Sequence, residues 1–222
     1  MLKLDILSDP ICPWCYIGKA HLFRALEARP DHPFALEWHP FQLNPDMPPE
    51  GMDRRAYLEG KFGGREGAVR AYAPVAEAAE KAGLSLNLDG MARTPSTLDA
   101  HRLIHWAGLE GRQTPVVQAL FAAYFEAGRD IGDHGVLLDV AEGCGMDRAM
   151  TERLLASDAD AEDIRGRDAH ARARGVTGVP TFVIASQAVV VGAQPPESWE
   201  GIIDDLQRQL AEQGVRDDAD PS

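Results

Sequence analysis

The chain has 222 residues, of which 45% are hydrophobic and 26% charged, and its formal net charge is −13. This size and hydrophobic content suffice for one domain, or for one domain with an insertion. The acidic character, with a pI near 4.9, argues against a general electrostatic hold on nucleic acid or on an anionic membrane. No segment approaches the roughly 20 apolar residues of a membrane span, so no membrane partner is expected.

The first segment, LKLDILSD (residues 2–9), alternates apolar with polar residues and predicts a strand. Its two aspartates and its alternation are unlike a secretory leader. The chain holds three cysteines, and an odd number argues against a framework of structural disulfides. From these features we expect a reducing, cytoplasmic setting, in which a Cys-x-x-Cys pair is usually catalytic or metal-binding.

The following segments predict a helix, a second strand and a long helical block. Residues 14–28 have helical periodicity, and Pro30 ends the helix. Residues 34–43 alternate like a strand, with Pro40 indicating an edge or a bulge. From about residue 53 to residue 175 the sequence is rich in alanine and helical in period.

Strand character returns after Gly175. Residues 181–185 and 188–193 are rich in β-forming residues, and the polar pair Ser186-Gln187 between them predicts a hairpin. A last helix is expected from Pro195-Pro196, because proline suits a first helical turn. Residues 214–222 are acidic and small, which predicts a disordered tail.

This order predicts an α/β (α+β) fold in which a small mixed sheet carries helices from both ends of the chain. Residues 1–50 and 175–213 would form one discontinuous domain. Residues 51–174 are too many for a loop and too poor in β-forming residues for a sheet. They are therefore expected to form an inserted α-helical domain.

Two cysteines lie two residues apart in SDPICPWCYIGK (residues 8–19). Disulfide exchange needs one thiolate that attacks and a second thiol close by that resolves the mixed disulfide. Cys12 lies near a helix N-terminus, where free N–H groups and the helix dipole stabilise an anion, and Cys15 lies one turn further in. Pro13 suits the first helical turn, and Trp14 offers an apolar contact beside the sulfur.

Other interpretations of the pair are a zinc site and two buried structural cysteines. Tetrahedral zinc needs two further ligands. The sequence has no second Cys-x-x-Cys, and Cys144 and the scattered histidines are poor candidates, so we expect no metal. Cys144 continues an apolar helical stripe and is predicted to be structural. These comparisons favour redox chemistry at Cys12 and Cys15.

Proline stands directly before a later strand in VTGVPTF (residues 176–182). A cis bond is essentially an option of proline alone. In thioredoxin-like sites a cis proline at this place sets its preceding residue against the cysteine pair. We therefore predict a cis bond between Val179 and Pro180, next to Cys12.

These motifs resemble those of the DsbA-like thioredoxin-fold oxidoreductases, in particular the leaderless FrnE-type branch. The resemblance implies a thioredoxin fold interrupted by an α-helical domain. It also implies that Cys12 is the nucleophile, Cys15 the resolving cysteine and Pro180 the cis proline. The matching stretches cover residues 1 to about 210 in family order and are SDPICPWCYIGK (8–19), WHPFQLNP (38–45), DAHRLIHWA (99–107), AYFEAGRDI (123–131), GVTGVPTFVI (175–184) and VVGAQPPE (190–197).

The function implied by the resemblance is cytoplasmic thiol–disulfide exchange with protein or small-thiol partners. No bound cofactor is expected, and glutathione is a candidate redox partner. The branch is close to glutathione-using 2-hydroxychromene-2-carboxylate isomerases and kappa-class glutathione transferases, which typically have serine in place of Cys12. A glutathione-dependent isomerase or transferase acting on an aromatic small molecule is thus one alternative. A non-catalytic peptide-binding or holdase module is another. Relatives of this type are often dimers, so a homodimer is also considered.

Several residues around the pair are candidates for substrate contact, among them Pro13, Trp14 and Val179. Phe41 could flank a substrate groove or pack in the core. His101, in the helical block, could line the cleft opposite the cysteines or be an ordinary helix histidine. Asp9 precedes Cys12 by three residues and could affect its proton affinity or cap the turn.

Overall fold

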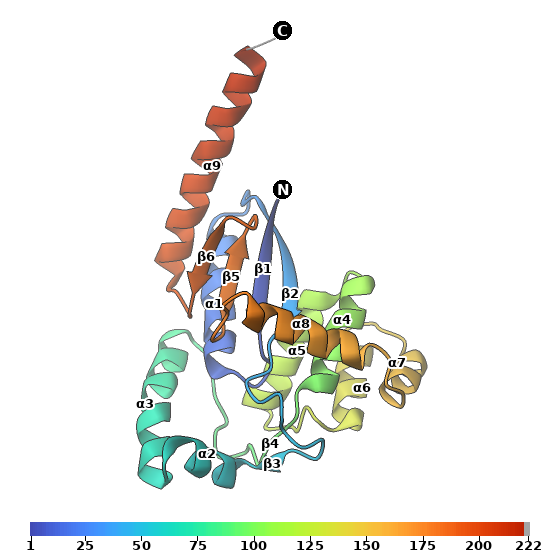
Figure 1. Cartoon of the computed structure of the whole chain (residues 1–222). Coiled ribbons are helices and arrows are strands. Elements are labelled where there is room, and N and C mark those ends of the chain that lie inside the picture. Colours follow the sequence, from blue (N-terminus) through green and yellow to red (C-terminus); the bar gives the residue numbers. More distant parts are fainter. Residues whose placement is uncertain (220–222) are drawn as a thin grey trace.

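A computed structural model describes the backbone of residues 1–219 and the side chains of residues 1–212 (Figure 1). The predicted disordered tail, residues 214–222, lies outside the described side chains, and its last three residues lie outside the described backbone. In the described part of the chain, no helix has the length and apolar character needed to cross a membrane.

Four strands form a mixed sheet in the order β2-β1-β5-β6. They are β1 (Leu2–Ser8), β2 (Phe34–Pro40), β5 (Thr181–Ile184) and β6 (Ala188–Val191). β1 is parallel to β2 and antiparallel to β5, which is antiparallel to β6. The predicted strands are confirmed. The second ends at Pro40, on the edge of the sheet, as expected for a residue that cannot donate to a ladder.

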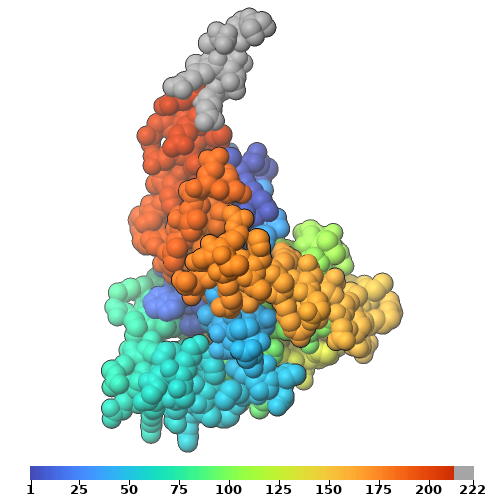
Figure 2. All heavy atoms as spheres, in the orientation of Figure 1, coloured from blue at the N-terminus to red at the C-terminus, as the bar shows by residue number. Residues whose placement is uncertain are grey.

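Helices cover the two faces of this sheet unequally (Figure 1). α1 (Pro13–Ala28) and α9 (Pro196–Ala219) pack together on one face, where the Phe182 and Trp199 rings meet edge to face at 4.7 Å. α8 (Ala161–Ala173) packs against β2 at the side of the other face. Figure 2 shows α9, in red, projecting beyond the rest of the molecule.

The strand register divides the side chains between these two faces. Leu4 and Ile6 of β1 are buried on the α1–α9 face, beside Phe182 and Ile184 of β5. Successive residues of a strand point to opposite faces. Asp5 and its partners on the neighbouring strands therefore lie on the other face, which we call the open face.

The β5–β6 hairpin turns at Ala185 and Ser186, whose φ angles are 49° and 58°. The Gln187 N–H donates to the Ile184 carbonyl at 2.9 Å and closes the turn. The hairpin is confirmed, but the turn is centred one residue earlier than the Ser186-Gln187 pair. A tight turn of this kind needs left-handed residues at its centre, whose backbone twist matches that of the strands.

The block between β2 and β5 is helical except for a short two-stranded ladder of β3 (Met52–Asp53) and β4 (Arg93–Thr94). This ladder was not expected, because two residues per strand give no detectable periodicity. The helices are α2 (Arg54–Phe62), α3 (Arg65–Lys81), α4 (Leu98–Leu109), α5 (Gln113–Phe121), the π-helical turn η1 (Ala122–Glu126), α6 (His134–Gly143), α7 (Arg148–Leu155) and α8.

Candidate active site

Cys12 is the N-cap of α1 and Pro13 is the first residue of the helix. The Cys12 N–H donates to the Asp9 carbonyl at 2.9 Å. Its own carbonyl accepts from the N–H groups of Cys15 and Tyr16, at 3.1 and 3.2 Å. The helix thus starts at the first cysteine, and the free N–H groups of its first turn surround that residue.

Both cysteine side chains are covered, since Cys12 is 3% exposed and Cys15 is 1% exposed. Burial, together with the hydrogen-bonded Cys12 thiol, raises the pKa of the Cys15 thiol well above its usual range. Cys15 therefore remains protonated at neutral pH, as a resolving thiol does until it reacts. Trp14, between them, is 38% exposed.

The loop before β5 meets the cysteines. The Val179–Pro180 peptide bond is cis, as the sequence analysis predicts, and the Cys12 Sγ lies 3.6 Å from the Val179 carbonyl oxygen. Two segments 167 residues apart in the sequence are thus in contact at the thiol.

Gly18 of α1, which was not among the candidate residues, allows this loop to approach. A Cβ at this position would lie 3.0 Å from Pro180 Cγ and 3.3 Å from Ala193 Cα. Any larger residue must therefore displace the proline loop. A glycine in the interior of a helix, one turn after Cys15, is a signal that could have indicated close packing.

Asp9 is fully buried in the turn between β1 and α1. Its carboxylate accepts hydrogen bonds from the Leu43 N–H at 2.7 Å and from the Ile11 N–H at 3.4 Å. The turn-capping role considered for Asp9 is therefore present. The same residue also ties the segment after β2 to the turn that carries Cys12.

His101 of α4 lies next to this carboxylate. Its Nε2 is 3.7 Å from Asp9 Oδ1, and among the described residues it has no hydrogen-bond partner. The side chain is 3% exposed. This differs from the cleft-lining position that was considered for His101, because the ring is buried beside the Asp9 carboxylate. His101 therefore lies on the buried side of the cysteine turn, next to Asp9.

Phe41 is likewise buried, at 2% exposed. It packs with Leu7 and Ala171, and Val179 lies against the same cluster. The Arg172 guanidinium covers the ring at 4.1 Å from its centre. The groove-flanking position considered for Phe41 is therefore replaced by a core position, and the ring supports the loop that carries Val179.

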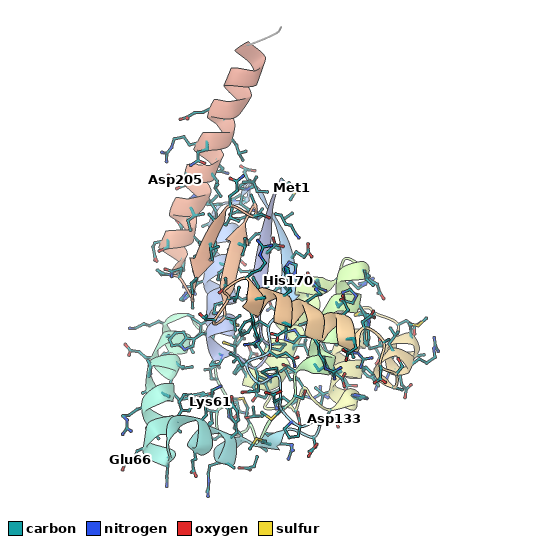
Figure 3. All side chains as sticks on the ribbon, viewed as in Figure 1. Met1, Lys61, Glu66, Asp133, His170 and Asp205 are labelled. Carbon is teal, nitrogen blue, oxygen red and sulfur yellow. The ribbon has the colours of Figure 1, made fainter. Side chains whose placement is uncertain are left out.

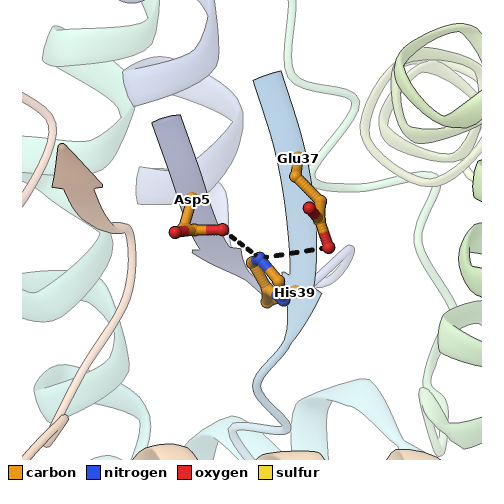
Figure 4. A group of neighbouring side chains, drawn as sticks. All are labelled: Asp5, Glu37 and His39. Carbon is orange, nitrogen blue, oxygen red and sulfur yellow. Dashed lines mark hydrogen bonds and ion pairs between the residues drawn. The ribbon is translucent and has the colours of Figure 1, made fainter. Parts of the chain in front are cut away.

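A second group of polar side chains lies on the open face, away from the cysteines (Figure 4). Asp5, Glu37 and His39 place one ligand atom each within 4.8 Å of the others. The Lys3 ammonium, however, already pairs with both carboxylates, at 2.8 and 2.7 Å. Arg167 donates to His39 Nδ1 at 3.1 Å.

The donors fix the tautomer of that histidine. A guanidinium can only donate, so Nδ1 must accept and Nε2 carries the ring proton. Nε2 accordingly donates to Asp5 Oδ1 at 2.6 Å. A metal-binding imidazole needs a free lone pair at that nitrogen. These residues therefore suit a closed charge network better than a cation site.

A cavity of about 810 Å³ lies between α8 and the open face. Its walls include the aliphatic Val183, Val189 and Val191, and His170, labelled in Figure 3, stands at its α8 side. Residues 176–178, which lead to Val179, also line it. The cavity therefore adjoins the proline loop, while neither cysteine of the pair belongs to its lining.

Comparison with known proteins agrees with this geometry. The family model of the DSBA-like thioredoxin domain matches residues 3–204. The crystal structure of the probable DsbA oxidoreductase SCO1869 from Streptomyces coelicolor is 30% identical, with a TM-score of 0.81, and the match covers 92% of this chain and 89% of that one.

Two further solved structures share the fold at lower identity. One is a 2-hydroxychromene-2-carboxylate isomerase, 19% identical with a TM-score of 0.72, covering 95% of this chain and 98% of that one. The other is the cytosolic disulfide reductase DsbM from Pseudomonas aeruginosa with GSH. It is 21% identical with a TM-score of 0.68, covering 93% of this chain and all of that one, 100%.

Proposed function

The chain belongs to the DSBA-like thioredoxin domain family, and from this premise we propose that it is a thiol–disulfide oxidoreductase acting through Cys12 and Cys15. One observation carries the proposal. The Cys12 sulfur lies at the N-terminus of α1 and 3.6 Å from the carbonyl of Val179, the residue before cis Pro180. The thiol at the helix N-terminus thus lies against the backbone of the proline loop, which is suited to receive a substrate.

The reaction proceeds in two exchanges. The Cys12 thiolate attacks one sulfur of a partner disulfide, a mixed disulfide forms, and the other partner sulfur leaves as a thiolate. Cys15 then loses its proton and attacks the Cys12 sulfur, which releases the second partner thiolate. The partner disulfide is reduced to two thiols, and Cys12 and Cys15 become a disulfide. The reverse sequence oxidises a partner.

The surroundings of the pair suit a polypeptide or a small thiol. Trp14 is exposed beside the cysteines, and Pro13 and Val179 are half-buried, so these three residues form the accessible rim. Phe41 and His101 are buried beneath this rim. Phe41 packs against the cluster that Val179 joins, and His101 contacts Asp9. We propose protein disulfides and small thiols such as glutathione as partners, with no bound cofactor.

A cytoplasmic location is part of this proposal. It is supported by the likeness to DsbM, whose structure is described as that of a cytosolic disulfide reductase with GSH. A reducing compartment would keep Cys12 and Cys15 as thiols between turnovers.

A glutathione-dependent isomerase is the second candidate. It is favoured by the likeness to 2-hydroxychromene-2-carboxylate isomerase, which at 19% identity is a likeness of fold. The presence of a second thiol at Cys15, in the first turn of the helix that Cys12 caps, favours redox chemistry, because isomerisation needs no resolving thiol. A holdase that binds peptides without turnover is a third candidate.

Reduction of insulin by dithiothreitol separates these candidates. The parent protein is expected to accelerate insulin precipitation, and Cys12→Ser is expected to abolish the acceleration. Cys144→Ser serves as the control, because that cysteine lies at the C-cap of α6. Equal rates for the parent and Cys12→Ser would contradict the proposal. Saturable glutathione binding without redox turnover would favour the isomerase, and suppressed insulin aggregation without reduction would favour the holdase.

A further inference from the structure

The floor of the cavity between α8 and the open face changes in character across the sheet. The strand register places Asp5 of β1 beside Val183 of β5, and Val183 beside Val189 of β6. In the next row, Thr181 of β5 lies beside Val191 of β6. All five residues line the cavity. Its floor is therefore charged towards β1 and β2 but aliphatic, apart from one hydroxyl, over β5 and β6.

The opposite wall of the cavity is one face of α8. Its lining residues are spaced by four, three and four positions, as on a single helical face: Asp163, Arg167, His170 and Arg174. This wall is acidic where the helix begins and basic where it ends. The basic end continues into residues 175–178, which also line the cavity and lead to the proline loop.

The charges around the cavity are not balanced evenly. Within the described residues, each acidic side chain of the lining has a basic partner: Asp5 with Lys3 at 2.8 Å, Glu162 with Arg165 at 2.5 Å and Asp163 with Arg167 at 3.9 Å. In the same part of the chain, the side chains of His170 and Arg174 have no hydrogen-bond or ion-pair partner, and both are exposed. The cavity thus offers a guanidinium and an imidazole N–H to an anionic group.

We propose that this cavity binds a small aliphatic carboxylate, such as a medium-chain fatty acid. The alkyl chain lies on Val183, Val189 and Val191, and the carboxylate is held by Arg174 and His170. A guanidinium presents its N–H groups as a fork that matches the two oxygens of a carboxylate. The cavity volume of about 810 Å³ lies within the range of roughly 300–1,000 Å³ that is usual for sites with apolar walls and a few polar groups.

The sign of the ligand's charge separates this site from general adsorption. The whole chain carries −13, so unspecific electrostatic attraction would favour a cationic amphiphile over an anionic one. At the cavity the preference is reversed, because Arg174 is close to the bound head group and physiological salt screens the more distant charges. An alcohol of the same chain length keeps the apolar contacts but leaves the guanidinium without a carboxylate.

The site is separate from the redox pair, since neither Cys12 nor Cys15 lines the cavity. Cys12→Ser should therefore bind the carboxylate as the parent does. A failure of binding and a failure of thiol exchange are thus distinguishable, because each is measured in a variant or an assay that the other does not need.

NMR titration of the ¹⁵N-labelled full chain tests the proposal, with octanoate, octanol and octyltrimethylammonium as probes at physiological salt. Octanoate should shift the amide signals of residues 174–178 and 188–191 in a saturable way, and should bind about three- to tenfold more tightly than octanol. Arg174→Gln should remove this preference while leaving octanol binding unchanged. The matched control is Arg70→Gln on α3, which removes the same charge outside the cavity lining.

A second variant blocks the cavity itself. Gly166 lines it, and a Cβ at this position has nothing within 4 Å, so Gly166→Phe should place its ring in the cavity without displacing its neighbours. Octanoate binding should then fall by at least about tenfold, since the ring occupies the space of the alkyl chain. Gly60→Phe on α2 is the control, because a Cβ there also has nothing within 4 Å. Far-UV circular dichroism checks that both variants fold.

The proposal is overturned by any of four results. These are the absence of saturable octanoate binding in the millimolar range, octyltrimethylammonium binding as tightly as octanoate, Gly166→Phe binding like the parent, and equal losses of octanoate and octanol binding in Arg174→Gln. Octanoate binding that disappears in Cys12→Ser would place the ligand at the redox pair and would also contradict it.

Discussion

His101 Nε2 lies 3.7 Å from Asp9 Oδ1, and both side chains are buried. Asp9 belongs to the turn before the cysteine helix, whereas His101 belongs to α4 of the helical block. Because the Asp9 carbonyl accepts the Cys12 N–H, the contact connects the inserted helices to the first turn of the cysteine helix. We expect this contact to hold that turn in place.

The first prediction concerns this buried contact. His101→Leu should lower the free energy of unfolding by about 1–3 kcal/mol, because it removes the polar ring that lies 3.7 Å from the buried Asp9 carboxylate and leaves an apolar side chain beside that charge. Urea titration measures the change. The control is His134→Leu, since His134 forms an exposed pair with Asp99 at 2.8 Å. Its loss should change the free energy of unfolding by less than about 1 kcal/mol. Equal losses in the two variants would mean that the buried contact has no special role.

The second prediction concerns the roles of the two cysteines. Cys15→Ser should accumulate a mixed disulfide with glutathione at Cys12, because the thiol that would resolve it is gone. Cys12→Ser should accumulate far less, since burial raises the pKa of the remaining Cys15 thiol and keeps it protonated. Intact-protein mass spectrometry after incubation with oxidised glutathione measures the adduct. Dominant labelling of Cys15 would reverse the assignment of roles.

The third prediction follows from the raised pKa of Cys15. The fold favours the neutral thiol, so this stabilising contribution is complete below the unfolded value of about 8.5 and is lost as pH rises through the folded value. The reduced parent should therefore lose up to about 1.4 kcal/mol of unfolding free energy per pH unit above about 8.5, relative to Cys15→Ala.

Urea titrations of the reduced proteins between about pH 7 and pH 9.5 test the third prediction. Burial raises the pKa of Tyr124 to about 12, so tyrosine ionisation would also change the stability at higher pH. The titrations therefore end below the pH at which tyrosine ionises. Oxidised parent is the control, since a disulfide has no thiol to titrate. A difference between the reduced parent and Cys15→Ala that does not change with pH would contradict the prediction.

The fourth prediction concerns the contact of α1 with the proline loop. Gly18→Ala should destabilise the protein by about 1–3 kcal/mol and slow thiol exchange, because the added Cβ meets Pro180 Cγ at 3.0 Å. Gly201→Ala in α9 is the matched control. A Cβ there has nothing within 4 Å, so alanine should stabilise the helix by about 0.5–1 kcal/mol. Thermal melting and the insulin assay measure both effects, and equal behaviour of the two variants would be contrary to expectation.

The fold order and the cysteine site could be predicted because their signals are local. Alternation marks β1 and β2, runs of β-forming residues mark the β5–β6 hairpin, and the pair Cys12 and Cys15 stands at the start of a helical period. The helical block between β2 and β5 was predicted from its length and its helical periodicity. The two-residue strands β3 and β4 were too short to produce a sequence pattern.

The surroundings of the site could not be predicted in the same way. Phe41 and His101 were candidates for a substrate cleft, yet both are buried, because segments far away in the sequence close over them. Arg172 covers the Phe41 ring, and Asp9 faces His101. Whether an aromatic or polar side chain lines a groove or fills a core depends on these distant neighbours, not on its own sequence context.

By itself, therefore, the sequence determined the elements, the position of the cysteine pair at a helix start and the place of Pro180, since hydrophobic period, helix starts and proline chemistry act over a few residues. Only the tertiary structure decided which edge of the sheet is covered. Gln113 from α5 occupies the β2 edge, while Val189 and Val191 stay exposed on β6. Hydrogen-bond satisfaction at a strand edge is set by whatever packs beside it, and that neighbour comes from another part of the chain.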